Sequence, residues 1–202
     1  MIRLYDFELS GNAHKVRNQL SLLGLDYERR PVDLLAGEQK TPDFLALNPF
    51  GRVPVLVDGD GDVVLRESGA ILVYLARKYG GSAWLPVDAE GEARVQEWLA
   101  IAGNEVANGP GLARLIEVFG ANGDLAGARD ASVALLERFE DHLTEHDFLA
   151  AGHPTIADVA NYSYIALAPD GGVALDAFPN VRVWLERIEK LPGFHAAPVK
   201  PR

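Results

Sequence analysis

Hydrophobic and polar residues follow two different patterns along the chain, and the change comes near residue 81. In the first part, residues 2–5 alternate as a short strand does, and residues 13–23 carry apolar side chains at helical spacing. Residues 27–32 form a second strand-like run, which completes a βαβ unit of about thirty residues. Residues 44–47 then predict a short second helix.

A hairpin and one more helix complete the first part. Two β-branched runs, residues 53–57 and 63–65, flank an Asp-Gly-Asp-Gly-Asp segment and predict the hairpin. Residues 68–79 place apolar side chains on one helical face, and the pattern ends at Gly80-Gly81. The first part therefore predicts a small α/β domain.

Strand patterns disappear after residue 81. Helical spacing continues in four stretches, at residues 88–119, 125–146, 155–167 and 179–191. A break is expected at Gly109-Pro110-Gly111, because proline interrupts a helix. The chain is therefore expected to form two domains, α/β at residues 1–81 and all-α at residues 89–202, with a linker at residues 82–88.

Composition excludes several kinds of chemistry. There are no cysteines, so disulfides, thiolate metal sites and a cysteine nucleophile are ruled out. The net charge of −10 argues against a general nucleic-acid or anionic-membrane surface. No basic segment leads into a long apolar run, and no apolar stretch approaches the ~20 residues that span a bilayer. We therefore expect a soluble cytoplasmic protein.

Pro54 stands inside a strand pattern, although proline cannot donate to a sheet ladder. Because only about 5–6% of X–Pro bonds in folded proteins are cis, spacing alone favours a trans proline that opens an edge strand. A cis bond would instead turn the backbone groups of Val53 outward, where an extended peptide pairs with them.

Glu67 and Ser68 come directly after the hairpin and open a helix. Local chemistry favours helix capping, because serine is a good N-cap and glutamate suits a first turn. The alternative is a binding site in which the helix N-terminus holds a carboxylate and Glu67 pairs with an ammonium group. A ligand with an α-amino acid end would satisfy both residues.

Residues 10–15, Ser-Gly-Asn-Ala-His-Lys, lie between the first strand and the first helix. They suit a turn with a helix cap. The same geometry also lets a hydroxyl or amide donate to a bound thiolate and lower the thiol pKa. His14 is expected to be a surface or half-buried side chain and not a general base. In the helical part, Thr155 and Asp158 have capping-box spacing, which is a folding signal without chemistry.

These motifs, in this order and spacing, resemble the glutathione transferase family. Residues 44–56, Phe-Leu-Ala-Leu-Asn-Pro-Phe-Gly-Arg-Val-Pro-Val-Leu, look like the family's segment leading to its cis-proline. Residues 65–75 look like its Glu-Ser motif and the helix behind it. The resemblance covers the whole chain and implies that the first domain is thioredoxin-like and the second is an all-helical bundle.

The resemblance also implies roles in glutathione binding. Val53, before a cis Pro54, would pair its backbone with the cysteinyl part of glutathione. Glu67 and Ser68 would hold the γ-glutamyl end. The resemblance thus changes the interpretation of Pro54, from a trans proline at an edge strand to part of a peptide-binding site.

Further roles follow from the same resemblance. The glycyl carboxylate would meet Arg52, or a residue near Gln39 and Lys40. Ser10 falls where serine-type members place the hydroxyl that faces the glutathione sulfur. Asn12 would share or take over that contact.

The activity implied is attack of the glutathione thiolate on a small electrophile, with glutathione as co-substrate and with no cofactor and no metal. The position of Ser10 is theta-like and zeta-like. Residues 10–15 also resemble the Thr-Pro-Asn-Gly-His-Lys of nu-like bacterial members, which reduce disulfides with glutathione, so a disulfide reductase is the alternative. A non-catalytic binding or assembly module is a third possibility.

The family resemblance implies a homodimer. Residues 98–108 are similar to a beta-class helix that lines the dimer cleft, which makes Asn104 and Glu105 candidates for contact with the partner subunit's glutathione. Phe50 lies where some classes insert a residue into the partner, and a buried loop aromatic is an equally good interpretation.

The all-helical domain is expected to form the second-substrate pocket, with Phe7, Leu9, Asn108 and Leu112 as the candidate lining residues. Such pockets are mostly apolar. The glycines beside Pro110 suggest an open or adaptable wall.

Overall fold

The computed structural model describes residues 1–59 and 62–198. Asp60 and Gly61 of the predicted hairpin turn, and residues 199–202 of the predicted helical domain, lie outside the described residues. The first domain consists of β1 (Ile2–Asp6), α1 (Gly11–Leu22), β2 (Tyr27–Pro31), α2 (Pro42–Leu47), β3 (Val55–Asp58), β4 (Val63–Arg66) and α3 (Ser68–Leu75). The second consists of α4 (Ala89–Gly103), α5 (Leu112–Phe119), α6 (Leu125–His142), α7 (Ile156–Ala166) and α8 (Pro179–Glu189).

The sheet has the strand order β2-β1-β3-β4. Strand β1 pairs with β2 in parallel and with β3 in antiparallel orientation, and β3 and β4 form the predicted hairpin. Leu4 of β1 lies opposite Leu56 of β3, and both side chains are fully buried. The parallel pair needs the α1 crossover, so the βαβ-ββα order dictates this four-stranded topology.

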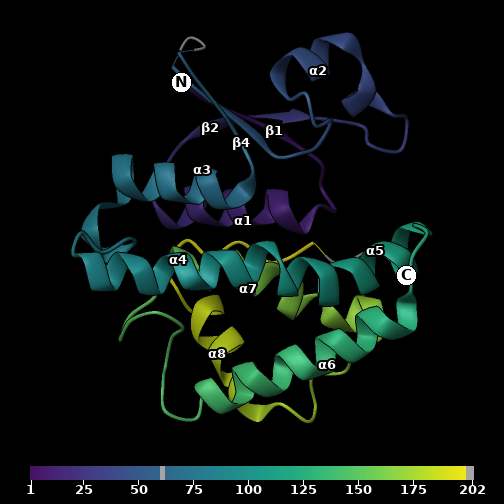
Figure 1. Ribbon diagram of the computed structural model, residues 1–202. Helices are drawn as coiled ribbons and strands as arrows, with labels where there is room; N and C mark the ends of the chain where they lie inside the picture. The colour runs from purple at the N-terminus through teal and green to yellow at the C-terminus, as the bar shows by residue number, and fades with distance from the viewer. Residues whose placement is uncertain (60–61, 199–202) are drawn as a thin grey trace.

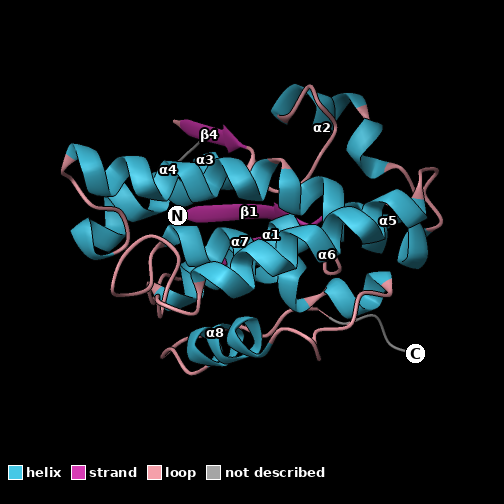
Figure 2. Ribbon diagram, turned by 60° about the horizontal axis from the view of Figure 1, so that its bottom comes forward, coloured by secondary structure: helices cyan, strands magenta, loops and turns pink. Residues whose placement is uncertain are grey.

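The elements form layers that Figure 1 shows from top to bottom. Helix α2 covers one face of the sheet through Phe44, and helices α1 and α3 cover the other through Val16, Leu20 and Ile71. Helices α4 and α7 follow beneath α1 and α3, and α6 and α8 lie farthest from the sheet. Figure 2 shows how little of the molecule is strand. The predicted two-domain architecture is confirmed.

The two domains share an apolar boundary. Leu72 and Ala76 at the end of α3 are buried in the same cluster as Leu85 and the core of the helical domain. Trp84 also accepts a backbone hydrogen bond from Ile156 through its carbonyl, at 3.0 Å. The domain boundaries at residues 81 and 89 stay predictions, because one apolar cluster contains residues from both sides of the linker.

Helix ends differ from the pattern in two places. Helix α3 ends at Leu75 and continues as a π-helical turn, Ala76–Gly80, although helical spacing runs to residue 79. Helix α6 ends at His142, although the helical spacing runs to residue 146. The prediction was too long because Leu143 is buried and continues the apolar spacing, while its backbone is only the C-cap of the helix. An apolar pattern indicates which residues are buried, and here the buried residues extend beyond the end of the helix.

The expected break in the first long helical stretch is confirmed. Helix α4 ends at Gly103, and a π-helical turn, Ala107–Gly111, contains Pro110 and leads into α5. Within the described residues, no helix has the length and hydropathy needed to cross a lipid bilayer.

The capping box at the start of α7 is confirmed, and its carboxylate does more than cap. Asp158 is fully buried and accepts hydrogen bonds from the backbone N–H of Thr155 and of Leu149, at 2.9 and 3.0 Å. It also accepts from the indole N–H of Trp184 at 2.9 Å. One side chain therefore holds α7, the loop before it and α8 together.

We expect Asp158→Ala to lower the free energy of unfolding by on the order of 3 kcal/mol, because it leaves several buried donors without an acceptor. Urea denaturation followed by circular dichroism measures the change. Asp176→Ala, at an exposed position in the same domain, is the matched control. Equal stabilities for the two variants would contradict the prediction.

Candidate functional site

Ser10 occupies the N-cap of α1. Its Oγ accepts a hydrogen bond from the backbone N–H of Ala13 at 3.2 Å, which confirms the capping interpretation. A serine hydroxyl that accepts through a lone pair keeps its own proton for a second partner. Capping therefore leaves Ser10 able to donate to an anion at the N-terminus of α1, where the helix dipole also favours negative charge.

The Val53–Pro54 peptide bond is cis, as the resemblance implied and spacing alone did not. The loop before it is fixed by Asn48, which is 1% exposed. The Asn48 side chain donates to the carbonyl of Arg52 at 2.7 Å and accepts from the backbone N–H of Phe50 at 3.1 Å. Because β3 begins only at Val55, the backbone of Val53 lies outside the sheet ladder. Asn48 was not singled out from the sequence, although an Asn before Pro-Phe-Gly suits such a turn.

Glu67 and Ser68 do not form the cap expected on local grounds. The residue at the N-cap of α3 is Glu67, with φ 67° and ψ 120°, and its side chain makes no capping hydrogen bond. A non-glycine residue at positive φ is uncommon and often marks a functional site. Ser68 Oγ instead donates to Asn12 Oδ1 at 3.3 Å, which joins the two motifs.

A small cavity of about 50 Å³ gathers most of the residues assigned to glutathione. It is lined by Asn12, Asn48, Arg52, Val53, Pro54, Glu67 and Ser68. Gln39 and Lys40 do not line it: Gln39 donates to the carbonyl of Leu34 at 3.3 Å, and Lys40 is exposed. The Gln39 carbonyl does lie beside the Gly51 turn, 3.1 Å from where a Cβ of residue 51 would stand, so the Gln39 backbone lies near the residue before Arg52.

A second cavity, of about 480 Å³, lies between the domains and contains all four residues predicted for the second substrate. Its lining is mostly apolar: Phe7, Leu9, Ser10, Asn12, Leu34, Leu35, Ala107, Asn108, Gly111, Leu112, Arg114, Leu115, Phe119 and Tyr164. Asn12 lines both cavities. The structure therefore brings the two predicted sites together at the N-terminus of α1.

The glycines beside Pro110 are tightly packed, which argues against the open or adaptable wall suggested by the sequence; Gly111 lines this cavity, whereas Gly109 lines a different one. Gly109, Pro110 and Gly111 are all buried. A Cβ at Gly109 would stand 3.3 Å from Ser132 Oγ, and one at Gly111 would stand 3.1 Å from the carbonyl of Val106. These glycines permit close packing between helices.

Tyr164 of α7 also lines the cavity and was not among the four residues predicted from the sequence. Its ring packs on Gly11, where a Cβ would stand 2.6 Å away, so α7 approaches α1 closely. The ammonium of Lys15 lies 5.2 Å from the ring centroid, and burial lowers the Lys15 pKa to about 8.

The expectation of a surface or half-buried His14 is wrong. His14 is fully buried between α1, α7 and the C-terminal segment. Its Nε2 lies 2.7 Å from the carbonyl oxygen of His195 and must donate, so Nδ1 accepts from the Ser163 hydroxyl at 2.8 Å. Desolvation lowers the His14 pKa to about 4. With both nitrogens engaged, His14 is a neutral structural link between the domains.

The cross-subunit candidates lie on the outer side of the helical domain. Asn104 and Glu105 are exposed and line a cavity of about 300 Å³, which Asn108 also lines. Asn108 donates to Asn104 Oδ1 at 3.0 Å, which connects this surface to the second-substrate cavity. Phe50 is 70% exposed, so the buried-aromatic interpretation is wrong for the single chain.

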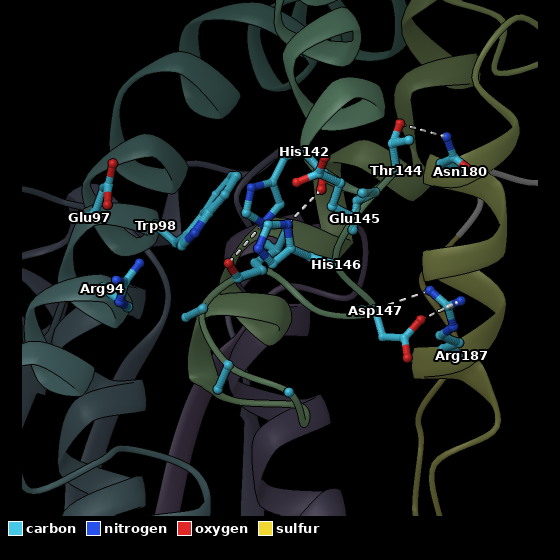
Figure 3. Close-up of a pocket in the computed structure, with 15 residues that line it drawn as sticks. Arg94, Glu97, Trp98, His142, Thr144, Glu145, His146, Asp147, Asn180 and Arg187 are labelled. Atoms are coloured by element: carbon cyan, nitrogen blue, oxygen red, sulfur yellow. Dashed lines mark hydrogen bonds and ion pairs between the residues drawn. The ribbon is translucent and has the colours of Figure 1, made fainter.

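A larger cavity, of about 950 Å³, is lined by residues of α4, the end of α6, the loop that follows it and α8 (Figure 3). His142 and His146 stack there with ring centroids 4.3 Å apart, and Arg187 pairs with Asp147 at 2.7 Å. None of the predicted site residues lines it. Among the described residues no group of three or more His, Cys, Asp or Glu side chains is arranged to hold a metal ion. The predicted site residues that line a cavity gather instead around the two cavities that share Asn12 and around the one beside Asn104 and Glu105.

Family models match both halves of the chain. Residues 1–77 match the glutathione S-transferase N-terminal domain, and residues 124–192 match the glutathione S-transferase C-terminal domain. The chain is similar over 99% of its length to glutathione S-transferase 3 of Zea mays, with 37% identity and 96% of that protein covered. It is 31% identical to a maleylacetoacetate isomerase of Pseudomonas aeruginosa, over 97% of this chain and 93% of that protein.

A solved structure shows the same family similarity. The crystal structure of a possible glutathione S-transferase from Rhodopseudomonas palustris superposes with a TM-score of 0.90. The two chains are 36% identical, and 99% of each is covered.

We expect the buried His14 to make the protein less stable in acid. The folded protein keeps His14 neutral down to about pH 4, whereas an unfolded chain takes up a proton near pH 6.5. The free energy of unfolding that depends on a neutral His14 therefore decreases as the pH falls below 6.5, and the loss reaches about 2 kcal/mol at pH 5.

Urea denaturation of the wild type and of His14→Gln at pH 7.5 and pH 5 gives the free energy of unfolding at both pH values. We expect the wild type to lose more of it between the two pH values than His14→Gln does. His153→Gln, at an exposed histidine, is the control. The interpretation is wrong if His14→Gln loses as much stability between the two pH values as the wild type does.

Proposed function

Because the chain belongs to the glutathione S-transferase family, we propose that it is a glutathione transferase that joins the sulfur of glutathione to a small, apolar electrophile. The observation that carries this proposal is the meeting of the two cavities at Asn12, beside Ser10. The thiol proton leaves to solvent, the thiolate forms a carbon–sulfur bond, and the leaving group departs or the adduct takes up a proton.

On the glutathione side, we propose that Glu67 pairs with the γ-glutamyl ammonium and that Ser68 and the N-terminus of α3 hold its carboxylate. The strained backbone of Glu67 and its free side chain support this role. The backbone of Val53, free of the sheet, pairs with the cysteinyl unit. Arg52 is the first candidate for the glycyl carboxylate, and Gln39 and Lys40 are the alternatives.

At the sulfur, we propose that the Ser10 hydroxyl donates to the thiolate and that Asn12 assists it. Ser10 keeps its proton available while capping α1, and Asn12 is already linked to Ser68. This arrangement, together with the absence of cysteine from the sequence, supports a serine-type site.

The larger of these two cavities supports an uncharged second substrate. Arg114 is the one charged residue among the described residues that line it, and Arg114 is already paired with Asp170 at 3.0 Å. A charged substrate would find no free counter-charge there. Phe7, Leu9 and Leu112 would contact the electrophile, and Asn108 would offer it an amide.

We also propose a homodimer, because this assembly is typical of the family. Asn104 and Glu105 would then face the partner, with a contact to its glutathione as their role. Sedimentation velocity of the wild type tests the assembly, and a glutathione affinity unchanged in Glu105→Ala would remove the cross-subunit role.

We expect Glu67→Ala to weaken glutathione binding by roughly tenfold or more, since a hydrogen bond to a charged group contributes about 1.5–3 kcal/mol. Calorimetric titration with reduced glutathione, and separately with glutathione disulfide, measures the effect. Glu186→Ala, on the exposed face of α8, is the control.

The same titration separates the alternatives. A clear preference for the disulfide would favour the disulfide reductase, and binding of neither compound would favour a non-catalytic module.

We expect Ser10→Ala combined with Asn12→Ala to raise the thiol pKa of bound glutathione toward its free value and to lower kcat by about 10–100-fold. The ultraviolet absorbance of the thiolate against pH gives the pKa, and a chromogenic aryl halide gives kcat. Ser21→Ala, near the other end of α1, is the control. An unchanged thiol pKa in the double variant would remove both residues from the sulfur site.

A further inference from the structure

We infer that Arg114, from the helical domain, is a positioning residue that holds the loop before Ser10 and thereby aligns the Ser10 hydroxyl. This inference rests on the proposed role of Ser10 in the transferase reaction. Arg114 lies on α5, far from Ser10 in sequence, and nothing in the sequence pattern distinguishes it from the surrounding helix.

The Arg114 guanidinium is 2% exposed and uses all three of its nitrogens. Nη1 donates to the backbone carbonyl of Leu9 at 2.9 Å, and Nε donates to Asp170 Oδ2 at 3.0 Å. Nη2 donates to the carbonyl of Pro198 at 3.2 Å. One rigid, planar group therefore ties the residue before Ser10 to the helical domain and to the C-terminal segment.

A second arginine holds the same loop from the other domain. Arg17 of α1 donates to the carbonyl of Glu8 at 2.8 Å, and Asp6 fixes it through contacts of 2.6 and 2.7 Å. The backbone N–H of Ser10 donates to the carbonyl of Phe7 at 2.9 Å. Each of the three carbonyls before Ser10 therefore has a donor, and Arg114 supplies the one adjacent to it.

Arg114 acts through the backbone and not through its charge. Asp170 already neutralises the guanidinium, so little field is left for the sulfur. The three hydrogen-bond partners of the guanidinium, Leu9, Asp170 and Pro198, are not among the residues that line the small glutathione cavity. Loss of Arg114 should therefore affect the alignment of Ser10 and leave the affinity for glutathione nearly intact.

Arg114→Lys is the central variant, because lysine keeps the positive charge but offers one nitrogen in place of three. We expect kcat to fall about tenfold, because small misplacements of catalytic groups are costly. The thiol pKa of bound glutathione should rise by about one unit, as one hydrogen bond to the thiolate weakens. The Kd for glutathione, measured at a pH below the bound thiol pKa where glutathione binds as the thiol, should change by less than about twofold. A purely structural defect of the glutathione site would weaken binding at that pH as well.

Arg129→Lys is the matched control. Arg129 also bonds a backbone carbonyl, that of Gly171 at 2.8 Å, and a carboxylate, that of Glu117 at 2.9 Å, but makes no contact with the loop before Ser10. We expect this variant to keep the wild-type thiol pKa and kcat. Equal thiol pKa values in Arg114→Lys and Arg129→Lys would overturn the inference.

A double-mutant cycle tests whether Arg114 acts through Ser10. In a Ser10→Ala background, Arg114→Lys should cause no further rise in the thiol pKa, because the hydroxyl that it aligns is gone. Fully additive shifts would contradict the inference.

If Arg114→Lys does not fold, Asp170→Asn provides the test, since it keeps the side-chain shape and weakens the anchor of Arg114. It should shift the thiol pKa in the same direction by a smaller amount, and an unshifted value would overturn the inference. Wild-type protein that does not bind glutathione would refute the proposed function itself, which is a separate and distinguishable outcome.

Discussion

The rest of the structure depends on helix α1, which is buried on all sides between the sheet and the helical domain. Every residue from 13 to 20 is buried, including the polar His14, Arg17 and Asn18. Burying a polar group is costly unless it finds a partner. The helical domain and the C-terminal segment supply several of them, because Ser163 and the His195 backbone bond His14, and the His195 N–H donates to Asn18. Polar pairing along α1 thus determines how the domains dock.

This constraint explains where the candidate site lies. Ser10 and Asn12 stand at the N-terminus of α1, at the one end of the helix where both domains contribute walls. The small cavity comes from the first domain alone, whereas the larger one needs α5 and α7. The first cavity is built on local features, a positive φ at Glu67 and a loop held by Asn48. The second depends on how the two domains dock, because its lining comes from both.

Sequence reasoning succeeded where a local motif determines local geometry. The hairpin, the crossover and the capping box at Thr155 followed from spacing and turn chemistry. His14 failed because the apolar positions of residues 13–23 mark one face of a helix, and no pattern indicates that a second domain covers the other face. Arg114 could not be singled out, since its role depends on meeting Leu9, 105 residues away in the sequence. The cis bond at Pro54 followed from family resemblance and not from spacing.

Ser10 and Glu67 show that structural and functional interpretations of a motif do not always compete. At Ser10 both hold, because the hydroxyl accepts from Ala13 as a cap and still has a proton to donate. At Glu67 the structural interpretation fails, since the side chain caps nothing and the backbone occupies an unfavourable region. A residue that satisfies its own helix is stable without a ligand, whereas a strained, unpaired carboxylate gains a partner only when one binds. Under the proposed function the two residues would have different parts: the Ser10 hydroxyl is already held in place as a cap in the free protein, whereas the exposed Glu67 side chain would gain its partner, an ammonium group, only on binding.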